Sequence, residues 1–421
     1  MSSTDIVDVL GRQVWDSRGR PTVEAEISLA GGAWGRAIAP AGASRGRHEA
    51  VDLRDGGKAF DGFGVTDAIN GINGDIAGCL NGMDASDQET VDRKIIDLDG
   101  TDSKENLGGN ATVAVSMAVL QAAASATHLP LWQYLAGERD VRIPMPEIQI
   151  FGGGAHAGGR VDIQDFMAVP IGAKSFHEAL CMIAEVYVAA GRLMKDADRL
   201  SGVADEGGWW PEFNTNEEAL DMLVRSIETA GMRPGEDVGI ALDVAASQFG
   251  SGGIYRLGLE DRQLDRTGMT DLLGDWIDQY PIVSIEDPFG EDDPAGFRLF
   301  TKKFGNSIQI IGDDFLVTNA DRINLAADAG SCNSALIKPN QAGTITETRA
   351  ALEAAKTAGW STVISARSGE TEDTTIAHLA VGWDAGQLKV GSFARSERMA
   401  KWNEVLRIEH ALGGRARLAA I

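Results

Sequence analysis

The stretch Pro281-Ile-Val-Ser-Ile-Glu-Asp-Pro288 decides the fold, because it joins a short apolar run to two adjacent carboxylates. Strands that are covered on both faces of a parallel sheet are typically continuous runs of Val, Ile and Leu, and residues 281–285 fit this pattern. A buried strand explains the run but not Glu286 and Asp287 at its end. These two carboxylates need a separate, chemical reason.

The same arrangement recurs through the second half of the chain. Apolar runs there end in Asp243, Asp313, Lys338 and Lys389, and helix-sized segments separate them. A spacing of roughly 25 to 45 residues is typical of successive βα units. If the strands close into a barrel, their charged ends meet at its C-terminal mouth, where such barrels keep their chemistry. The pattern therefore predicts an α/β barrel whose cavity is lined by these residues and Glu286.

Length and composition bound the architecture and the partners. The 421 residues exceed one ordinary domain, so we expect an N-terminal α+β domain over residues 1–138 and a barrel over residues 139–421. A formal charge of −24 argues against nucleic acid or an anionic membrane surface as partner. Three scattered cysteines indicate a reducing compartment and buried thiols. Because the sequence shows neither a signal pattern nor a membrane-length apolar run, we expect a cytoplasmic protein.

The first domain is predicted to contain strands followed by helices. Residues 5–29 alternate as a hairpin and residues 34–38 could add a third strand. Residues 58–135 are helical in pattern, with an Ala-rich amphipathic run over residues 106–126. The small-residue segment 40–46 is either a plain surface loop or a mobile lid over a site.

Two loops carry further candidate residues. His156 lies in residues 151–159, which are too rich in glycine for a regular element, and Asp165 begins the strand that follows. A lone histidine is usually structural, but this position favours a role at the site. Glu206 precedes two glycines, and by itself this is a weak indication because most loop carboxylates are solvated.

Residues 365–373 form a dense polar cluster after an apolar run. Arg367 and Ser368, together with backbone amides at the start of the next helix, would make a phosphate cradle. A capped helix N-terminus that binds no ligand would also explain the cluster.

The strand-end residues predict a metal-assisted reaction. Asp243, Glu286 and Asp313 offer an all-oxygen donor set, which suits a hard cation such as Mg²⁺ rather than zinc. Ion pairs with the two lysines are the alternative, but three acids leave negative charge that a metal ion neutralises. A cation would lower the pKa of an adjacent lysine, so Lys338 is the candidate base for removing a proton next to a carboxylate. A protonated Glu206 on the opposite face could assist departure of a hydroxyl, giving proton abstraction followed by elimination.

With these residues in hand, the chain resembles the enolase family over nearly its full length. The resemblance is carried by ordered motifs at residues 16–19, 40–44, 53–55, 203–208, 240–247, 284–288, 312–314, 338–344, 367–373 and 395–398. It implies a small N-terminal α+β domain and an enolase-type (β/α)8-like barrel whose first strands depart from simple βα order. It also implies a lyase, phosphopyruvate hydratase, that dehydrates 2-phosphoglycerate to phosphoenolpyruvate, and a homodimer or larger assembly.

The resemblance assigns roles by motif position. Ligands of a first Mg²⁺ are implied at Asp243, Glu286 and Asp313, and the residue that closes on a second, substrate-dependent Mg²⁺ at Ser44. The base that takes the C2 proton is implied at Lys338, and the acid that helps expel the C3 hydroxyl at Glu206. Substrate contacts are implied at His156, Gln164, Asp165, Arg367, Ser368 and Lys389.

Several pocket positions depart from the family pattern. Ala366 stands where the family has a histidine, Asp165 is one methylene shorter than the usual glutamate, and Arg45 adds a cation to the closing loop. One hypothesis is a phosphopyruvate hydratase in which Arg45 or Arg160 replaces the missing donor. A second is a paralogue acting on a phosphonate-type acid, such as the carboxyphosphonoenolpyruvate synthases of phosphinothricin-type pathways. A third is a non-catalytic binding protein, against which the retained metal and base residues argue.

Overall fold

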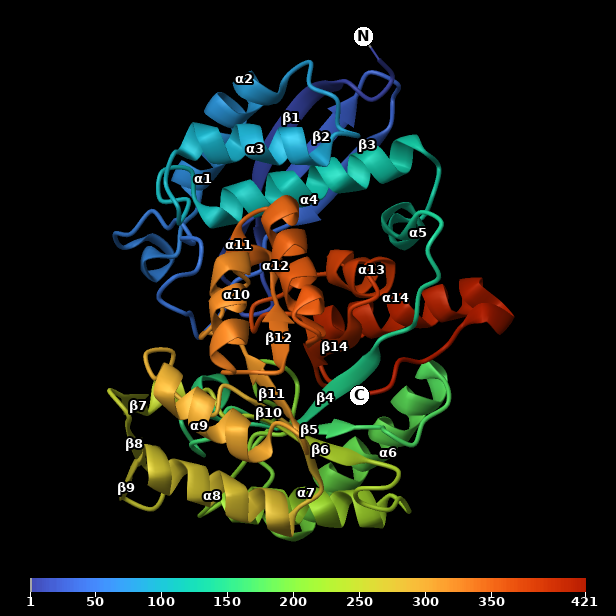
Figure 1. The fold of residues 1–421 in the computed structure, drawn as a ribbon. Coiled ribbons are helices and arrows are strands. Elements are labelled where there is room, and N and C mark those ends of the chain that lie inside the picture. The colour runs from blue at the N-terminus through green and yellow to red at the C-terminus, as the bar shows by residue number, and fades with distance from the viewer. Residues whose placement is uncertain (1) are drawn as a thin grey trace.

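The computed structural model describes residues 2–421 as a barrel with a smaller domain above it (Figure 1). Eight strands close the barrel in the order β10-β11-β12-β13-β14-β4-β5-β6. Their bounds are β4 (Met145–Gly152), β5 (Asp165–Val169), β6 (Gly239–Asp243), β10 (Ile282–Glu286), β11 (Gln309–Gly312), β12 (Ser334–Ile337), β13 (Ser361–Ser365) and β14 (Gly386–Gly391). The predicted α/β barrel is confirmed.

One strand of the barrel runs against the others. β5 pairs antiparallel with both β4 and β6, whereas the remaining neighbours pair in parallel. The expected departure from simple βα order is therefore confirmed. Because β5 is reversed, its first residue lies at the mouth, and Asp165 pairs in register with Asp243, the last residue of β6.

Helices surround the barrel (Figure 1). They are α6 (Phe176–Asp196), α7 (Asn216–Thr229), α8 (Arg266–Gln279), α9 (Pro294–Phe304), α10 (Ala320–Ala329), α11 (Pro339–Ala342), α12 (Ile345–Thr357), α13 (Thr375–Gly382) and α14 (Ser396–Leu412). Six of them begin after a side chain that accepts a first-turn amide, which satisfies a donor that the helix leaves free. These cap residues are Ser175, Thr215, Asp265, Asp293, Asn319 and Thr344. A small antiparallel sheet of β7 (Gly250–Ser251), β8 (Ile254–Leu257) and β9 (Arg262–Asp265) precedes α8.

The N-terminal domain follows the predicted order of strands and then helices. The antiparallel sheet contains β1 (Ile6–Trp15), β2 (Pro21–Leu29) and β3 (Trp34–Ile38). The helices are α1 (Thr66–Gly71), α2 (Ala77–Leu80), α3 (Gln88–Asp99), α4 (Gly109–Ala126) and α5 (Leu131–Ala136). The expected domain boundary after residue 138 stays a prediction, and it falls in the connection between α5 and β4.

The Ala-rich helix differs from the expected amphipathic one. α4 begins at Gly109 rather than at residue 106, and nearly all of its side chains are buried. It lies between β2 and β3 of its own domain and the barrel helices α11 and α12. A helix that is covered on all sides needs no polar face, and small alanine side chains allow the close approach of its neighbours. The prediction of an amphipathic helix was therefore wrong.

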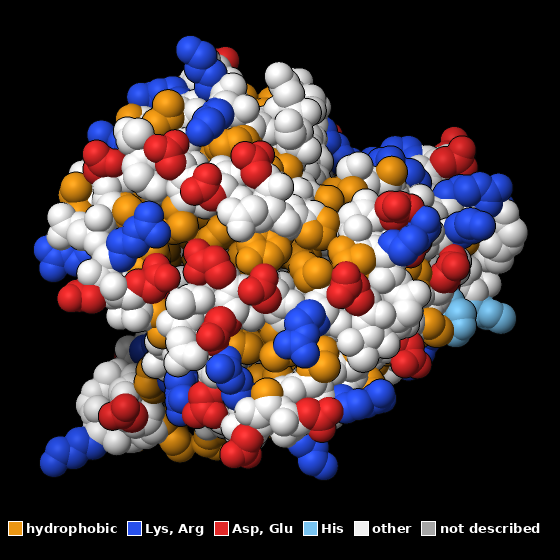
Figure 2. Space-filling view, turned by 90° about the horizontal axis from the view of Figure 1, so that it is seen from below, with side chains coloured by type: hydrophobic (Ala, Val, Ile, Leu, Met, Phe, Trp, Pro, Cys, Tyr) orange, Lys and Arg blue, Asp and Glu red, His pale blue; other side chains and the backbone are white. Residues whose placement is uncertain are grey.

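The surface carries mixed charge. On the face in Figure 2, acidic and basic side chains are interspersed with hydrophobic ones. Of the three cysteines, Cys332 is buried as expected, but Cys181 is exposed, so the expectation of buried thiols was wrong there. Within residues 2–421, none of the helices combines the length and apolar character needed to cross a bilayer.

Candidate active site

The strand ends bring the predicted acids and lysines to the barrel mouth. Asp243 and Glu286 are the last residues of β6 and β10, and Asp313 and Lys338 directly follow β11 and β12. Lys389 differs from the expectation, because β14 continues past it to Gly391. All five are buried. The convergence predicted from the apolar runs is therefore present, with one lysine inside a strand rather than at its end.

Two lysines divide the three acids between them. The Lys389 Nζ lies 2.8 Å from both Asp243 Oδ2 and Glu286 Oε2. The Lys338 Nζ lies 2.5 Å from Asp313 Oδ2. Both lysines thus form ion pairs with the acids, which is the alternative to a metal site.

The acid set nevertheless fits a hard divalent cation. Glu286 is fully buried, and its Oε1 has no hydrogen-bond partner within the described residues. Burial and the nearby carboxylate of Asp243 raise the pKa of Glu286 well above its usual range, although Lys389 opposes this shift. An acid that is buried beside another acid, with one oxygen free, gains from a cation that binds oxygen ligands. Asp243, Glu286 and Asp313 therefore suit Mg²⁺ by chemistry and burial.

Two neighbouring aspartates were not among the predicted ligands. Oxygens of Asp287, Asp313 and Asp314 lie within 4.8 Å of one another. The two carboxylate oxygens of Asp287 accept the backbone amides of Asp313 and Asp314, each at 2.8 Å. Asp287 therefore fixes the turn that carries Asp313, which gives the second carboxylate of the Pro281–Pro288 stretch a structural role.

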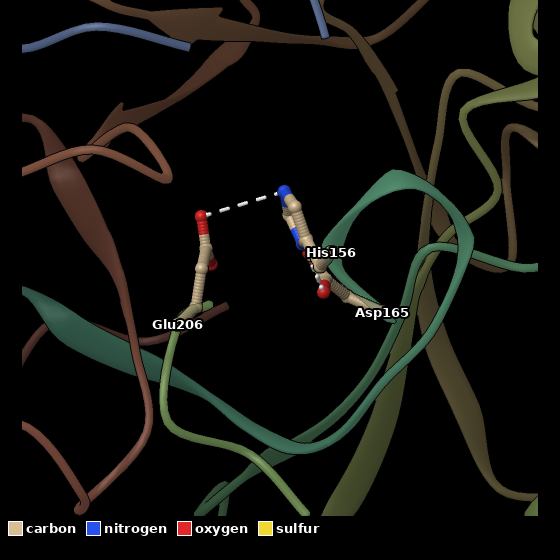
Figure 3. Close-up of side chains that lie close together, drawn as sticks. All are labelled: His156, Asp165 and Glu206. Carbon is tan, nitrogen blue, oxygen red and sulfur yellow. Dashed lines mark hydrogen bonds and ion pairs between the residues drawn. The ribbon is translucent and has the colours of Figure 1, made fainter. Parts of the chain in front are cut away.

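A histidine between two acids forms the other part of the mouth (Figure 3). The His156 Nδ1 lies 3.1 Å from Asp165 Oδ1, and its Nε2 lies 3.7 Å from Glu206 Oε1. His156 comes from a short helical turn after β4, and Glu206 comes from the loop between α6 and α7. Gly391 lets this loop approach β14, since a Cβ there would lie 2.6 Å from the backbone oxygen of Glu206.

This cluster favours the presence of a proton at neutral pH. Burial lowers the pKa of His156, but the carboxylates of Glu206 and Asp165 raise it by more, and the resulting pKa is about 9. Burial raises the pKa of Glu206, although His156 opposes this shift. Both shifts place a proton on the pair of His156 and Glu206. The pair can therefore donate a proton into the pocket.

The proposed phosphate cradle is in contact with residues 40–46, the segment expected to be either a surface loop or a lid. The Arg367 guanidinium donates to both oxygens of Glu49, to Asn340 Oδ1 and to the Ser44 carbonyl, at 2.9 to 3.2 Å. The Ser368 hydroxyl accepts the Ala43 amide at 2.6 Å. Residues 42–44 therefore lie over the cradle. Both cradle side chains, Arg367 and Ser368, are hydrogen-bonded to this segment.

One pocket collects most of the predicted site. Among the described residues it is lined by Gly42, Ala43, Ser44, His156, Gln164, Glu206, Asp243, Lys338, Ser365, Ala366, Arg367, Ser368 and Lys389. Arg45 is outside this lining, and its guanidinium lies 3.6 Å from Asp52 on an exposed part of the loop. Arg160 is exposed and pairs with Glu212 at 2.9 Å. Neither arginine reaches the pocket here, so its role in replacing a missing donor stays a prediction.

Sequence reasoning missed several buried partners of the site. Glu49 binds Arg367, and Gln149 binds Asp165 and accepts the Gly208 amide at 2.8 Å. Gln341 donates to Asp313 Oδ1 at 2.9 Å. Of these three, Gln341 lies in a quoted motif, residues 338–344, and could have been found there. The others have no spacing or neighbouring pattern that marks them.

These features define a class of protein, a barrel enzyme that moves protons beside a cation site. They are the barrel mouth, the carboxylate set, the buried lysines and the proton-holding pair of His156 and Glu206. Family models agree, matching "Enolase, N-terminal domain" over residues 6–135 and "Enolase, C-terminal TIM barrel domain" over residues 140–421. Enolase 1 of Desulfitobacterium hafniense (strain Y51) is 51% identical over 420 residues, which cover 99% of this chain and 96% of that protein. The chain belongs to the enolase family and is a lyase.

Proposed function

We propose that the protein catalyses the Mg²⁺-dependent dehydration of 2-phosphoglycerate to phosphoenolpyruvate. The observation that carries this proposal is that one pocket is lined by a lysine and an acid from different sides of the mouth, Lys338 and Glu206. Elimination of water across a carbon–carbon bond needs one group to accept a proton and another to donate one. The similarity to Enolase 1 supports this reaction and does not favour the phosphonate-type alternative.

Lys338 is the proposed base. Burial lowers the pKa of Lys338, but Asp313 raises it, and the result lies above the ordinary value while the two residues pair. Asp313, Asp243 and Glu286 would hold the Mg²⁺. A bound Mg²⁺ would stabilise the negative charge that develops on the substrate carboxylate, and its positive charge would lower the pKa of the adjacent Lys338. Lys338, in its neutral form, takes the proton from C2 through its Nζ.

Glu206 is the proposed acid. It is buried beside His156, and burial raises its pKa while His156 opposes this shift. The proton held by the pair would pass through Glu206 to the departing C3 hydroxyl. His156 is fixed by Asp165, which also accepts a hydrogen bond from Gln149. Because Asp165 is held by these neighbours, we infer that it orients His156 rather than reaching the substrate.

Lys389, Arg367 and Ser368 are the proposed contacts for the anionic ends of the substrate. Lys389 lies between Asp243 and Glu286, near the proposed position of the substrate carboxylate. Arg367 must exchange some of its contacts with Glu49 and Ser44 for phosphate oxygens. We therefore propose that the segment containing Ser44 shifts when substrate binds, and that Ser44 then contacts a second Mg²⁺. A homodimer or larger assembly in the cytoplasm is proposed from the family resemblance.

The test is absorbance-monitored turnover of 2-phosphoglycerate by the purified protein in Mg²⁺, with a Lys338→Ala protein as the blank. We expect robust, Mg²⁺-dependent formation of phosphoenolpyruvate. A protein that folds and binds Mg²⁺ but gives no product would defeat the proposal and would favour a substrate with a different anionic end.

A further inference from the structure

Two consecutive residues beside the site have an unusual backbone. Val317 and Thr318 have φ values of +46° and +51°, in the left-handed region. β-branched residues seldom adopt this conformation, and both side chains are almost fully buried. Strain of this kind persists only where the surroundings enforce it, and it tends to occur at functional sites. Neither residue has a role in the proposed reaction.

The Thr318 hydroxyl belongs to a closed ring of hydrogen bonds. Its Oγ accepts the backbone amide of Lys338 at 2.9 Å and donates to Gln341 Oε1 at 2.6 Å. The Gln341 Nε2 donates to Asp313 Oδ1 at 2.9 Å. The ring closes where Lys338 Nζ donates to Asp313 Oδ2 at 2.5 Å. Lys338 therefore takes part twice, through its backbone and through its ammonium group.

The ring joins two strand ends that carry different functions. Asp313 and Thr318 lie in the connection from β11 to α10, and Lys338 and Gln341 lie where β12 passes into α11. The left-handed turn at residues 317–318 brings the Thr318 hydroxyl back under Lys338, and the Val317 amide donates to the Asp313 carbonyl at 2.7 Å. Asp313 has each of its carboxylate oxygens on a different donor. A buried network whose members are all paired is rigid.

We propose that Thr318 and Gln341 are positioning residues that set the separation between the base Lys338 and the metal ligand Asp313. This inference rests on the proposed function. Neither residue needs to touch the substrate, because each acts through one of these two groups. The left-handed turn supplies one hydroxyl to both the Lys338 amide and Gln341.

The sharpest test compares Thr318→Val with Thr318→Ser. Valine keeps the β-branched shape but removes the hydroxyl, whereas serine keeps the hydroxyl and removes the methyl group. Because a misplacement of about 1 Å costs on the order of 100-fold, we expect Thr318→Val to lower kcat roughly 10- to 100-fold, with KM for 2-phosphoglycerate changed less than about threefold. Thr318→Ser should stay within about threefold of the unmodified protein.

Thr348→Val is the matched control. Thr348 is also a buried threonine, and its hydroxyl donates at 2.6 Å to the carbonyl of Thr344, the N-cap residue of α12. Thr348 does not line the pocket. We expect Thr348→Val to leave kcat unchanged. Equal losses of kcat in Thr318→Val and Thr348→Val, or in Thr318→Val and Thr318→Ser, would overturn the inference.

A second variant and a second readout keep the test independent of folding and of the substrate. Gln341→Met removes the side-chain hydrogen bonds of Gln341 to Thr318, Asp313 and Glu49. Combining it with Thr318→Val should cost little more than the worse single change, because both break one ring. Hydrogen exchange at the Lys338 amide should speed up in Thr318→Val but not in Thr318→Ser. If the unmodified protein fails to turn over 2-phosphoglycerate, the proposed function falls, while unchanged amide exchange in Thr318→Val would defeat the ring.

Discussion

On one side of the barrel mouth, the parallel strands β11 and β12 deliver Asp313 and Lys338 at their C-terminal ends, whereas across the barrel the antiparallel β5 begins with Asp165. β5 is four strands from β12 in the eight-stranded order, so the two groups face each other. Loops supply the rest of the β5 side, namely His156 and Glu206. The first side is built on strand ends, and the second mostly on loops that the barrel supports.

The two sides also differ in how they hold charge. On the strand-end side, the Lys338 ammonium meets the Asp313 carboxylate directly, while Lys389, inside β14, pairs with Glu286 and lies 3.6 Å from Asp165 between the two sides. On the loop side, one imidazole lies between two carboxylates, which raises its pKa to about 9. The strand-end side is thus suited to bind a cation and to accept a proton after the cation has bound. The loop side is suited to donate a proton. Substitutions on the two sides should therefore separate proton removal from water loss.

The largest effect is expected for Lys338→Ala. Loss of the base should lower kcat by roughly 10³- to 10⁴-fold. It should also abolish exchange of the substrate C2 proton with solvent deuterium, measured by NMR of 2-phosphoglycerate in D₂O. Lys303→Ala is the control, since Lys303 is exposed on α9 and pairs only weakly with Asp271 at 3.4 Å. Retained C2 exchange in Lys338→Ala would show that another group is the base.

A smaller and more selective effect is expected for Glu206→Gln. Glutamine keeps the shape of the side chain but cannot donate an acidic proton, so dehydration should slow by roughly 10²- to 10³-fold. C2 exchange should continue, because the strand-end side is intact. Glu212→Gln, which alters an exposed carboxylate of the same loop, should leave both rates unchanged. Equal loss of exchange and of dehydration in Glu206→Gln would mean that the two sides do not act separately.

The difference between the two sides also explains what could be predicted from the sequence. Charged residues such as Glu286 stand out because they interrupt apolar runs, and parallel strands bring such ends together. Glu206 gave only a weak signal by itself, because a loop carboxylate looks the same whether it is solvated or buried. The resemblance to family motifs assigned Glu206 as the acid, which the residue pattern alone could not do.

Other features depend on long-range contacts that no local pattern encodes. The side chain of Glu49 meets Arg367 across more than three hundred residues of chain. The near-complete burial of α4 depends on the barrel that packs against it, so its alanines by themselves predict only one face of an amphipathic helix. The left-handed turn at Val317 contains no glycine, so the sequence does not predict it. In each case the missing information is the neighbour, which only the folded chain supplies.

The pH dependence of stability tests the loop side alone. His156 has a folded-state pKa of about 9, raised above the ordinary 6.5, so its ion pairs stabilise the fold fully below pH 6.5 and lose this contribution as the pH rises through 9. Relative to His156→Asn, the unmodified protein should be more stable by at most about 3 kcal/mol at low pH, and this advantage should vanish near pH 10. Urea unfolding between pH 6 and pH 10 measures it. Parallel curves for the two proteins would show that His156 is not charged in the fold.

The smallest effect is expected for Arg45→Ala. The Arg45 side chain is 42% exposed and lies 3.6 Å from Asp52, which also accepts a hydrogen bond from Arg54 at 2.9 Å. Exposed ion pairs of this kind contribute little, so kcat/KM for 2-phosphoglycerate should change less than about threefold. Arg367→Lys calibrates the same assay, because loss of a planar, multiply bonded guanidinium at the proposed phosphate contact should raise KM by about tenfold or more.

A rise in KM for Arg45→Ala that approaches that of Arg367→Lys would reverse this expectation. It would mean that substrate draws Arg45 away from Asp52 and into the pocket, where it supplies the donor that Ala366 lacks. The segment next to Arg45 already contacts the proposed cradle through Ser44, so such a movement requires a rearrangement of one loop. Arg45 would then join the pocket only in the substrate complex. The closing loop would be a third source of charged groups, in addition to the strand-end side and the loop side.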